Sequence, residues 1–150
     1  MTTFVKWFLV NATVLTGAFF AEQKGGISLI INNDISHISI VIMALYICVS
    51  GFVGHLCYKA DRADSNRQAL QKSSDIGWFA AEHFFSLGLL GTIIGLCVAT
   101  STSLGNDMVL SEMVAGLKVG LNTAFYTTMC GIICSLPLQL QLMILKQELE

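Results

Sequence analysis

Charged residues are scarce in this sequence. Only 12% of its 150 residues are Asp, Glu, Lys or Arg, whereas roughly a quarter is usual for a soluble domain. With 54% hydrophobic residues, a mean hydropathy of +0.69 and a single proline, this shortage of charge excludes an ordinary soluble helical bundle. The net charge of −2 is too small to indicate a nucleic-acid partner.

Patterns typical of metal sites and of catalysis are also lacking. The five cysteines lie inside or at the edge of apolar runs, where a cysteine behaves as a small hydrophobic residue. Cys130 and Cys134 share a helix face, but no histidine stands near them to complete a metal site. No Ser/His/Asp, phosphate-loop or metal-ligand spacing is visible. We therefore expect no enzyme activity, no cofactor, no metal and no disulfide framework.

Four apolar stretches dominate what is present, and each is long enough to cross, or nearly cross, a hydrocarbon core of roughly 30 Å. They predict an all-α membrane protein that forms a single domain over residues 1–150, with the stretch 23–37 as a connector. The first stretch has only 15 uncharged residues between Lys6 and Glu22, so it spans, lies in the interface to leave three transmembrane helices, or is a cleaved signal peptide. The helices are expected at about 4–21, 38–58, 82–104 and 117–145.

Basic residues predict how these helices are oriented. Residues 59–75 contain half of the eight lysines and arginines, whereas 101–116 contain none. Short loops rich in lysine and arginine stay in the cytoplasm. The segment 59–81 and the C-terminus are therefore placed in the cytoplasm, and 105–116 form an outer loop.

The last two helices carry small and hydroxylated residues on one face. In membranes such a strip lets another backbone approach closely, and serine or threonine often only satisfies the carbonyl four residues before it. A strip this wide also suits a surface that faces something wet or polar, and both alternatives stay open. The residues are Gly88, Gly91, Thr92, Gly95 and Ala99 in the third helix and Gly120, Ala124, Thr127, Thr128, Gly131 and Ser135 in the fourth.

Thr92 and Thr128 are predicted to share one depth. Thr92 lies ten residues from Glu82, and Thr128 ten residues from Lys118, so each is about 15 Å from the nearest charge on its own helix. On antiparallel neighbours both hydroxyls then lie near the middle of the membrane. Apart from cysteine, no residue of 84–104 or 119–145 can ionise usefully at the midplane, so a carboxylate that carries an ion here must come from another chain.

Glu82 and His83 stand at the predicted cytoplasmic end of the third helix. Two interpretations apply to them: they anchor the helix in the interface, or they line a cytoplasmic mouth through which an ion leaves.

Two motifs in order resemble a known family. The stretch SLGLLGTIIGL, residues 86–96, resembles the Leu-Gly-Leu-Leu-Gly-Thr-Val-x-Gly-Leu signature of the MotA/TolQ/ExbB proton channel family. The stretch GLNTAFYTTMCG, residues 120–131, is similar to that family's second signature, Gly-Ile-x-x-Ala-Leu-x-x-Thr-x-x-Gly. The chain departs from ExbB-like members at Phe85, where proline is frequent, and at Thr123, where a glutamate is found.

The resemblance implies a multi-pass subunit of the bacterial inner membrane, in contact with lipid. It implies a homopentameric ring around a central pore, lined by the last two helices, with two copies of a MotB/ExbD/TolR-like partner that has one transmembrane helix. An aspartate of the partner would carry H⁺ or Na⁺ past Thr92 and Thr128, and the ion gradient would drive rotation. Thr127 beside Thr128 resembles the paired threonines of sodium-driven members. The alternatives are a non-conducting membrane scaffold that oligomerises through its small faces, and a holin-like membrane protein.

Overall fold

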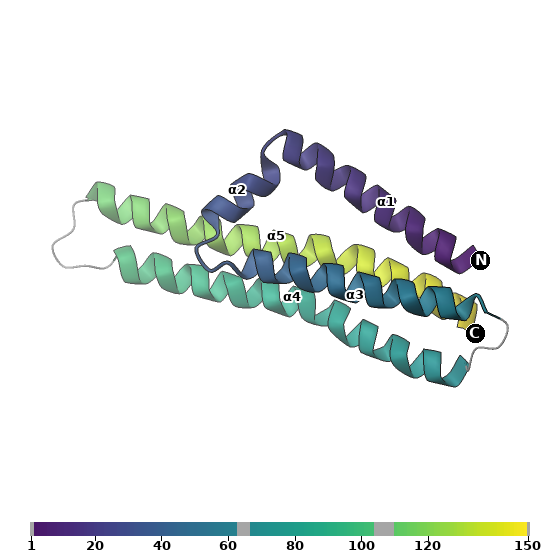
Figure 1. Cartoon of the computed structure of the whole chain (residues 1–150). Helices are drawn as coiled ribbons and strands as arrows, with labels where there is room; N and C mark the ends of the chain where they lie inside the picture. The colour runs from purple at the N-terminus through teal and green to yellow at the C-terminus, as the bar shows by residue number, and fades with distance from the viewer. Residues whose placement is uncertain (1, 63–66, 104–109, 150) are drawn as a thin grey trace.

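The computed structural model describes residues 2–62, 67–103 and 110–149, and in these ranges every regular element is a helix (Figure 1). Four of the helices are long and apolar enough to cross a membrane, which makes the chain an all-helical, multi-pass membrane protein. The fifth, α2, is a short helix between the first two long ones. The helices are α1 (Thr2–Gln23), α2 (Gly26–Asn33), α3 (Ile38–Ala60), α4 (Arg67–Ser103) and α5 (Leu110–Leu149).

The helices α4 and α5 form a long antiparallel pair, and α3 lies beside one half of it (Figure 1). The start of α1, the end of α3, the start of α4 and the end of α5 meet at one end of the molecule. Six of the eight basic residues lie at this end, which is called the basic end below: Lys6, Lys59, Arg62, Arg67, Lys72 and Lys146.

The helix α4 extends well before residue 82, the predicted start of the third transmembrane helix. The helix α4 begins at Arg67, because Leu70, Ser74, Gly77 and Ala81 are buried at spacings of three and four residues and continue its packed face. Likewise α5 begins at Leu110, so the expected outer loop 105–116 is helical from 110 onward, and its residues 105–109 lie outside the described ranges.

The connector predicted over 23–37 contains the helix α2, which is anchored on α5. The Thr123 hydroxyl lies 3.1 Å from the Asn33 carbonyl oxygen and 3.3 Å from the Ile35 backbone nitrogen, which donates to it. Beside it, buried Asp34 accepts a hydrogen bond of 2.8 Å from the Ser39 backbone nitrogen in the first turn of α3. Thr123 thus fastens the connector to α5.

The helix α1 is attached through polar groups. Its first backbone N–H groups, those of Thr3 and Phe4, donate to the Asp61 carboxylate just after α3, at 3.2 and 3.1 Å. Further along, the Trp7 indole donates to the Ser50 carbonyl and to Gln141 Oε1, both at 3.1 Å. Because α1 otherwise exposes large apolar side chains, these contacts fix its position against α3 and α5.

Polar contacts also define a network inside the bundle. Gln141 is fully buried in α5, and its Oε1 lies 3.0 Å from the Ser50 hydroxyl of α3. The Ser50 hydroxyl in turn lies 2.9 Å from Asn11 Oδ1 of α1. Three helices therefore meet at one amide, and this set of residues, Trp7, Asn11, Ser50 and Gln141, is called the Gln141 network below.

Candidate functional site: the α4–α5 seam

The contact between α4 and α5, called the seam below, is built from small residues. A Cβ added to Gly95 would stand 2.6 Å from the Gly120 carbonyl oxygen, and one added to Gly131 would stand 2.8 Å from the Phe84 carbonyl oxygen. Because backbone atoms cannot turn aside as side chains can, only glycine fits at these positions. The eight predicted packing residues are all buried in the seam: Gly88, Gly91, Gly95, Ala99, Gly120, Ala124, Gly131 and Ser135.

This close approach accounts for the small residues within a single chain. Ser135 adds a polar contact, because its hydroxyl donates to the Ala81 carbonyl at 2.8 Å. Of the two interpretations of the small strip, backbone packing therefore applies to these eight residues, and two threonine hydroxyls at the edge of the seam remain to be explained.

Thr92 and Thr128, which the sequence predicted to share one depth, meet across the seam. Their hydroxyls are hydrogen-bonded to one another, and both residues are half-buried. Thr92 Oγ1 lies 3.2 Å from the Gly88 carbonyl of its own helix and 3.2 Å from the Ala124 carbonyl of α5. Thr128 Oγ1 lies 3.0 Å from Ala124 O and 3.4 Å from Gly88 O. Two hydroxyls and two carbonyls form a nearly symmetric cluster of oxygen atoms, called the Thr92–Thr128 cluster below.

The proton count limits what the Thr92–Thr128 cluster can do. Each hydroxyl has one proton and two lone pairs, and a backbone carbonyl has only lone pairs. When one hydroxyl donates to the other, a single proton remains to be shared among the carbonyls and any incoming group. The cluster can therefore offer oxygen lone pairs to a cation or one hydrogen bond to a carboxylate, but it does not itself ionise.

Thr127 takes a different position from the other two predicted ion-pathway residues. It is fully buried in the seam, where its hydroxyl lies 2.9 Å from the Thr123 carbonyl and 3.1 Å from the Ala124 carbonyl of its own helix. Its side chain packs against Gly91, where an added Cβ would stand 2.5 Å from Thr127 Cβ. The structure therefore does not bring its hydroxyl into the Thr92–Thr128 cluster.

Glu82 and His83, the residues predicted at the cytoplasmic mouth, are both exposed on α4. The His83 Nδ1 atom lies 2.7 Å from the Phe79 carbonyl oxygen, and the two rings are 3.9 Å apart between centroids. Glu82 directly follows Ala81, whose carbonyl oxygen accepts a hydrogen bond from the Ser135 hydroxyl of α5. Glu82 therefore lies beside the part of α5 near Ser135.

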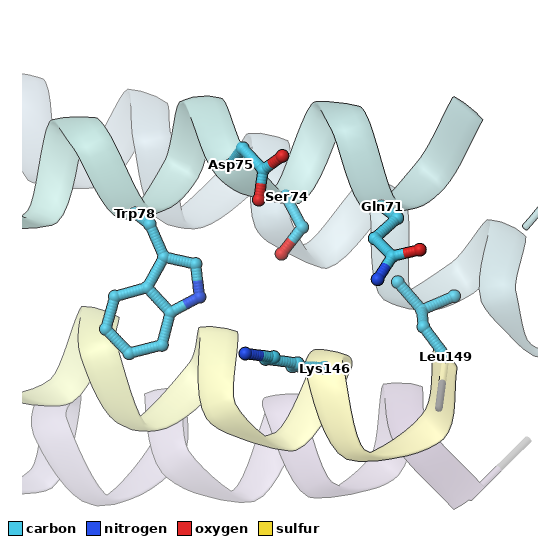
Figure 2. A pocket seen from close by; sticks show the side chains of 6 residues that line it. All are labelled: Gln71, Ser74, Asp75, Trp78, Lys146 and Leu149. Carbon is cyan, nitrogen blue, oxygen red and sulfur yellow. The ribbon is translucent and has the colours of Figure 1, made fainter. Parts of the chain in front are cut away.

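Sequence reasoning missed a polar pocket between α4 and α5 near the basic end. The pocket has a volume of about 190 Å³ and lies beside Lys146, three residues before the end of α5 as described. Figure 2 shows Trp78, Ser74 and Gln71 projecting from α4 toward α5, with Lys146 opposite them. A signal was present in the sequence, because Gln71, Trp78 and Phe85 precede Thr92 at steps of seven residues and so share one face of α4. The lining residues are Gln71, Ser74, Asp75, Trp78, Lys146 and Leu149.

Within the described ranges no group of three histidine, cysteine or acidic residues is placed to hold a metal ion. The chemistry that the seam can perform is therefore that of hydroxyl and carbonyl oxygens between two tightly packed membrane helices.

The sequence comparisons agree with this geometry. No curated protein and no solved structure matches the sequence significantly. A family model, described as the MotA/TolQ/ExbB proton channel family, matches residues 60–150, a range that contains both seam helices, both signature motifs and the pocket at the basic end. Because the match covers more than half of the sequence, the chain belongs to the MotA/TolQ/ExbB proton channel family and is a membrane subunit of the proton-channel type.

Proposed function

We propose that this chain is the ion-channel subunit of a MotA/TolQ/ExbB-like motor in the bacterial inner membrane. It works without enzymatic chemistry as a homopentameric ring whose α4 and α5 helices surround two copies of a MotB/ExbD/TolR-like partner. The proton or sodium gradient drives rotation of the ring around the partner. The lysines and arginines of residues 59–75 support a cytoplasmic location for the basic end, and α1 is one of four spanning helices.

The Thr92–Thr128 cluster is the observation that carries this proposal. It lies on the helix pair that bears the family motifs, it is half-exposed rather than sealed, and it offers one hydrogen bond and several lone pairs. A carboxylate of the partner could accept that hydrogen bond when ionised, or donate to a lone pair when protonated. Thr127 is given a packing role in this proposal, because its hydroxyl is buried against its own helix.

The scaffold alternative is less well supported by the packing. It needs small faces that are free to join another subunit, whereas the described small faces of α4 and α5 are buried against each other within one chain.

The test replaces each hydroxyl by a methyl group in the complex isolated from its native membrane through a tag on this chain. A hydrogen bond to a charged group contributes about 1.5–3 kcal/mol, so Thr92→Val and Thr128→Val should each lower ion influx into proteoliposomes roughly 10- to 100-fold. Native mass spectrometry should show unchanged assembly, and Thr92→Ser should restore most of the influx.

A matched control is available on the same helix. Among the contacts of the described residues, the exposed Thr100 hydroxyl bonds to the Leu96 and Cys97 carbonyls of its own turn, so Thr100→Val should leave the influx unchanged. Wild-type influx in both seam variants would disprove the proposed role of the cluster.

A further inference from the structure

The apolar bands of the helices are displaced along the bundle axis. Ser50 of α3 contacts Gln141, and the next residue, Leu142, packs against Gly77, where an added Cβ would stand 2.6 Å from the leucine. The middle of the uncharged run of α3, 38–58, is therefore level with about residue 79 of α4, whereas the middle of the uncharged run of α4, 84–104, is residue 94. The displacement is about 15 residues, or roughly 22 Å.

The neighbours of α4 show where the membrane lies beside its charged half. Gly77 packs against Leu142 and Gly88 against Gly131, so Glu82, which lies between these two contacts, is level with about residues 136–137 of α5. Leu136 is 61% exposed, and Met143, two turns closer to the basic end, is still 54% exposed. On α3, Ile47 near the same level is 71% exposed, and Phe52, more than one turn closer to the basic end, is 39% exposed. Large apolar side chains on two helices thus continue about 10 Å beyond Glu82 toward the basic end.

The basic residues set the limit of the membrane in the same place. Lys6, Lys59 and Lys146 come from three different helices and gather at the basic end, beyond Met143. If the membrane instead ended at Glu82, the exposed apolar side chains of α3 and α5 below that level would stand in water. Glu82 therefore lies inside the hydrocarbon layer rather than at its edge.

A carboxylate at this depth cannot face lipid without a large penalty. Glu82 is exposed on α4, and at steps of seven residues it shares a row with Asp75 on one side and with Leu89 and Leu96 on the other. From Glu82 toward the basic end the row continues with the acidic Asp75, and in the opposite direction it continues with the apolar Leu89 and Leu96. Its acidic half begins beside the polar pocket, which Asp75 lines (Figure 2).

From this placement we infer that Glu82 lies within the membrane and faces a water-filled vestibule on the inner surface of the ring, which opens at the basic end past Asp75. Glu82 is then this chain's own carboxylate on the inward half of the ion path, about 15 Å along α4 from Thr92. The inference rests on the proposed function, and it moves Glu82 from the predicted mouth into the membrane.

Single-cysteine chains test the depth and the water contact separately. The native Cys48 is exposed on α3 near the level of Glu82. It therefore serves as the control position that lies at the same depth but is expected to face lipid. In chains that keep one cysteine at a time and assemble as the wild type does, a membrane-impermeant, positively charged methanethiosulfonate is added from the basic side. Glu82→Cys and Asp75→Cys should be modified, whereas Cys48 and Leu89→Cys should not.

Two labelling results would overturn the inference. Modification of both Cys48 and Glu82→Cys would show that this level lies outside the membrane. Modification of neither would show that Glu82 faces lipid or protein rather than water. For the role in the ion path, Glu82→Gln should lose most of the ion influx while Glu82→Asp keeps it, and full influx with glutamine would remove that role. If Thr92→Val and Thr128→Val keep full influx, the proposed function fails, while the labelling still decides where Glu82 lies.

Discussion

The seam between α4 and α5 and the attachment of α1 to the bundle hold helices together in opposite ways. The seam brings backbones together through glycine, so its geometry is fixed by atoms that cannot rotate away. The attachment of α1 relies on side chains: the Trp7 ring packs against Gly54 of α3, and the Gln141 network adds hydrogen bonds between the helices. The seam therefore suits a site whose oxygen atoms must stay in register, whereas α1 is held by side chains that can be replaced one at a time.

The largest predicted effect comes from filling the seam. Gly95→Ala places a methyl group 2.6 Å from the Gly120 carbonyl oxygen and 2.7 Å from the Ala124 backbone nitrogen, so α4 and α5 must separate. Overpacking of this kind costs about 1–3 kcal/mol. The thermal unfolding midpoint of the detergent-solubilised protein should fall by several degrees, and the Thr92–Thr128 cluster should open.

Gly51→Ala in α3 is the matched control, because an added Cβ there meets nothing within 4 Å. Equal unfolding midpoints for the two alanine variants would contradict the claim that the seam, rather than glycine as such, determines stability.

The seam also shows how far the sequence predicts the structure. The distances of Thr92 and Thr128 from the nearest charges predicted that these two residues share one height, because helix rise is constant and the helices are antiparallel, and the structure shows that they also meet. Thr127 could not be separated from Thr128 in this way. A rotation of 100° along the helix decides which hydroxyl reaches the edge, and this rotation depends on how deeply Gly91 lets the helices approach.

The axial displacement of α3 was not predictable from the sequence, since apolar runs show length but not relative height. The sequence alone therefore predicts that the charge of Glu82 marks the end of a span. The sequence did not predict the Gln141 network for a similar reason. Polar and apolar residues alternate around Gln141 near the end of α5, and only the packed structure shows that its amide contacts Trp7 and Ser50.

A medium effect is expected from removing the amide on which the α1 attachment depends. Gln141→Leu leaves the Trp7 indole and the Ser50 hydroxyl without their shared acceptor, and interhelical hydrogen bonds in membranes contribute about 0.6–1.7 kcal/mol. With Trp78→Phe in the background, Trp7 fluorescence should become more accessible to a lipid-soluble quencher. Gln139→Leu is the control, because that amide bonds only to Ser135 of its own helix among the described contacts. Equal quenching in both variants would argue against the network.

The smallest effect is expected at the end of α1, and it depends on pH. Burial tends to raise the pKa of Asp61, but hydrogen bonds from the start of α1, those of the Phe4 and Thr3 backbone N–H groups among them, together lower the pKa below its usual value. A carboxyl group with a lowered folded-state pKa stabilises the fold above its unfolded pKa, near 4 for a typical aspartate, and loses this contribution as the pH falls through the folded value. Trp7 quenching should therefore rise in acid, below pH ~4. Asp61→Asn should show the acid level of quenching at neutral pH and remove most of the pH dependence; if the asparagine variant titrates as the wild type does, the attachment of α1 does not depend on this carboxylate.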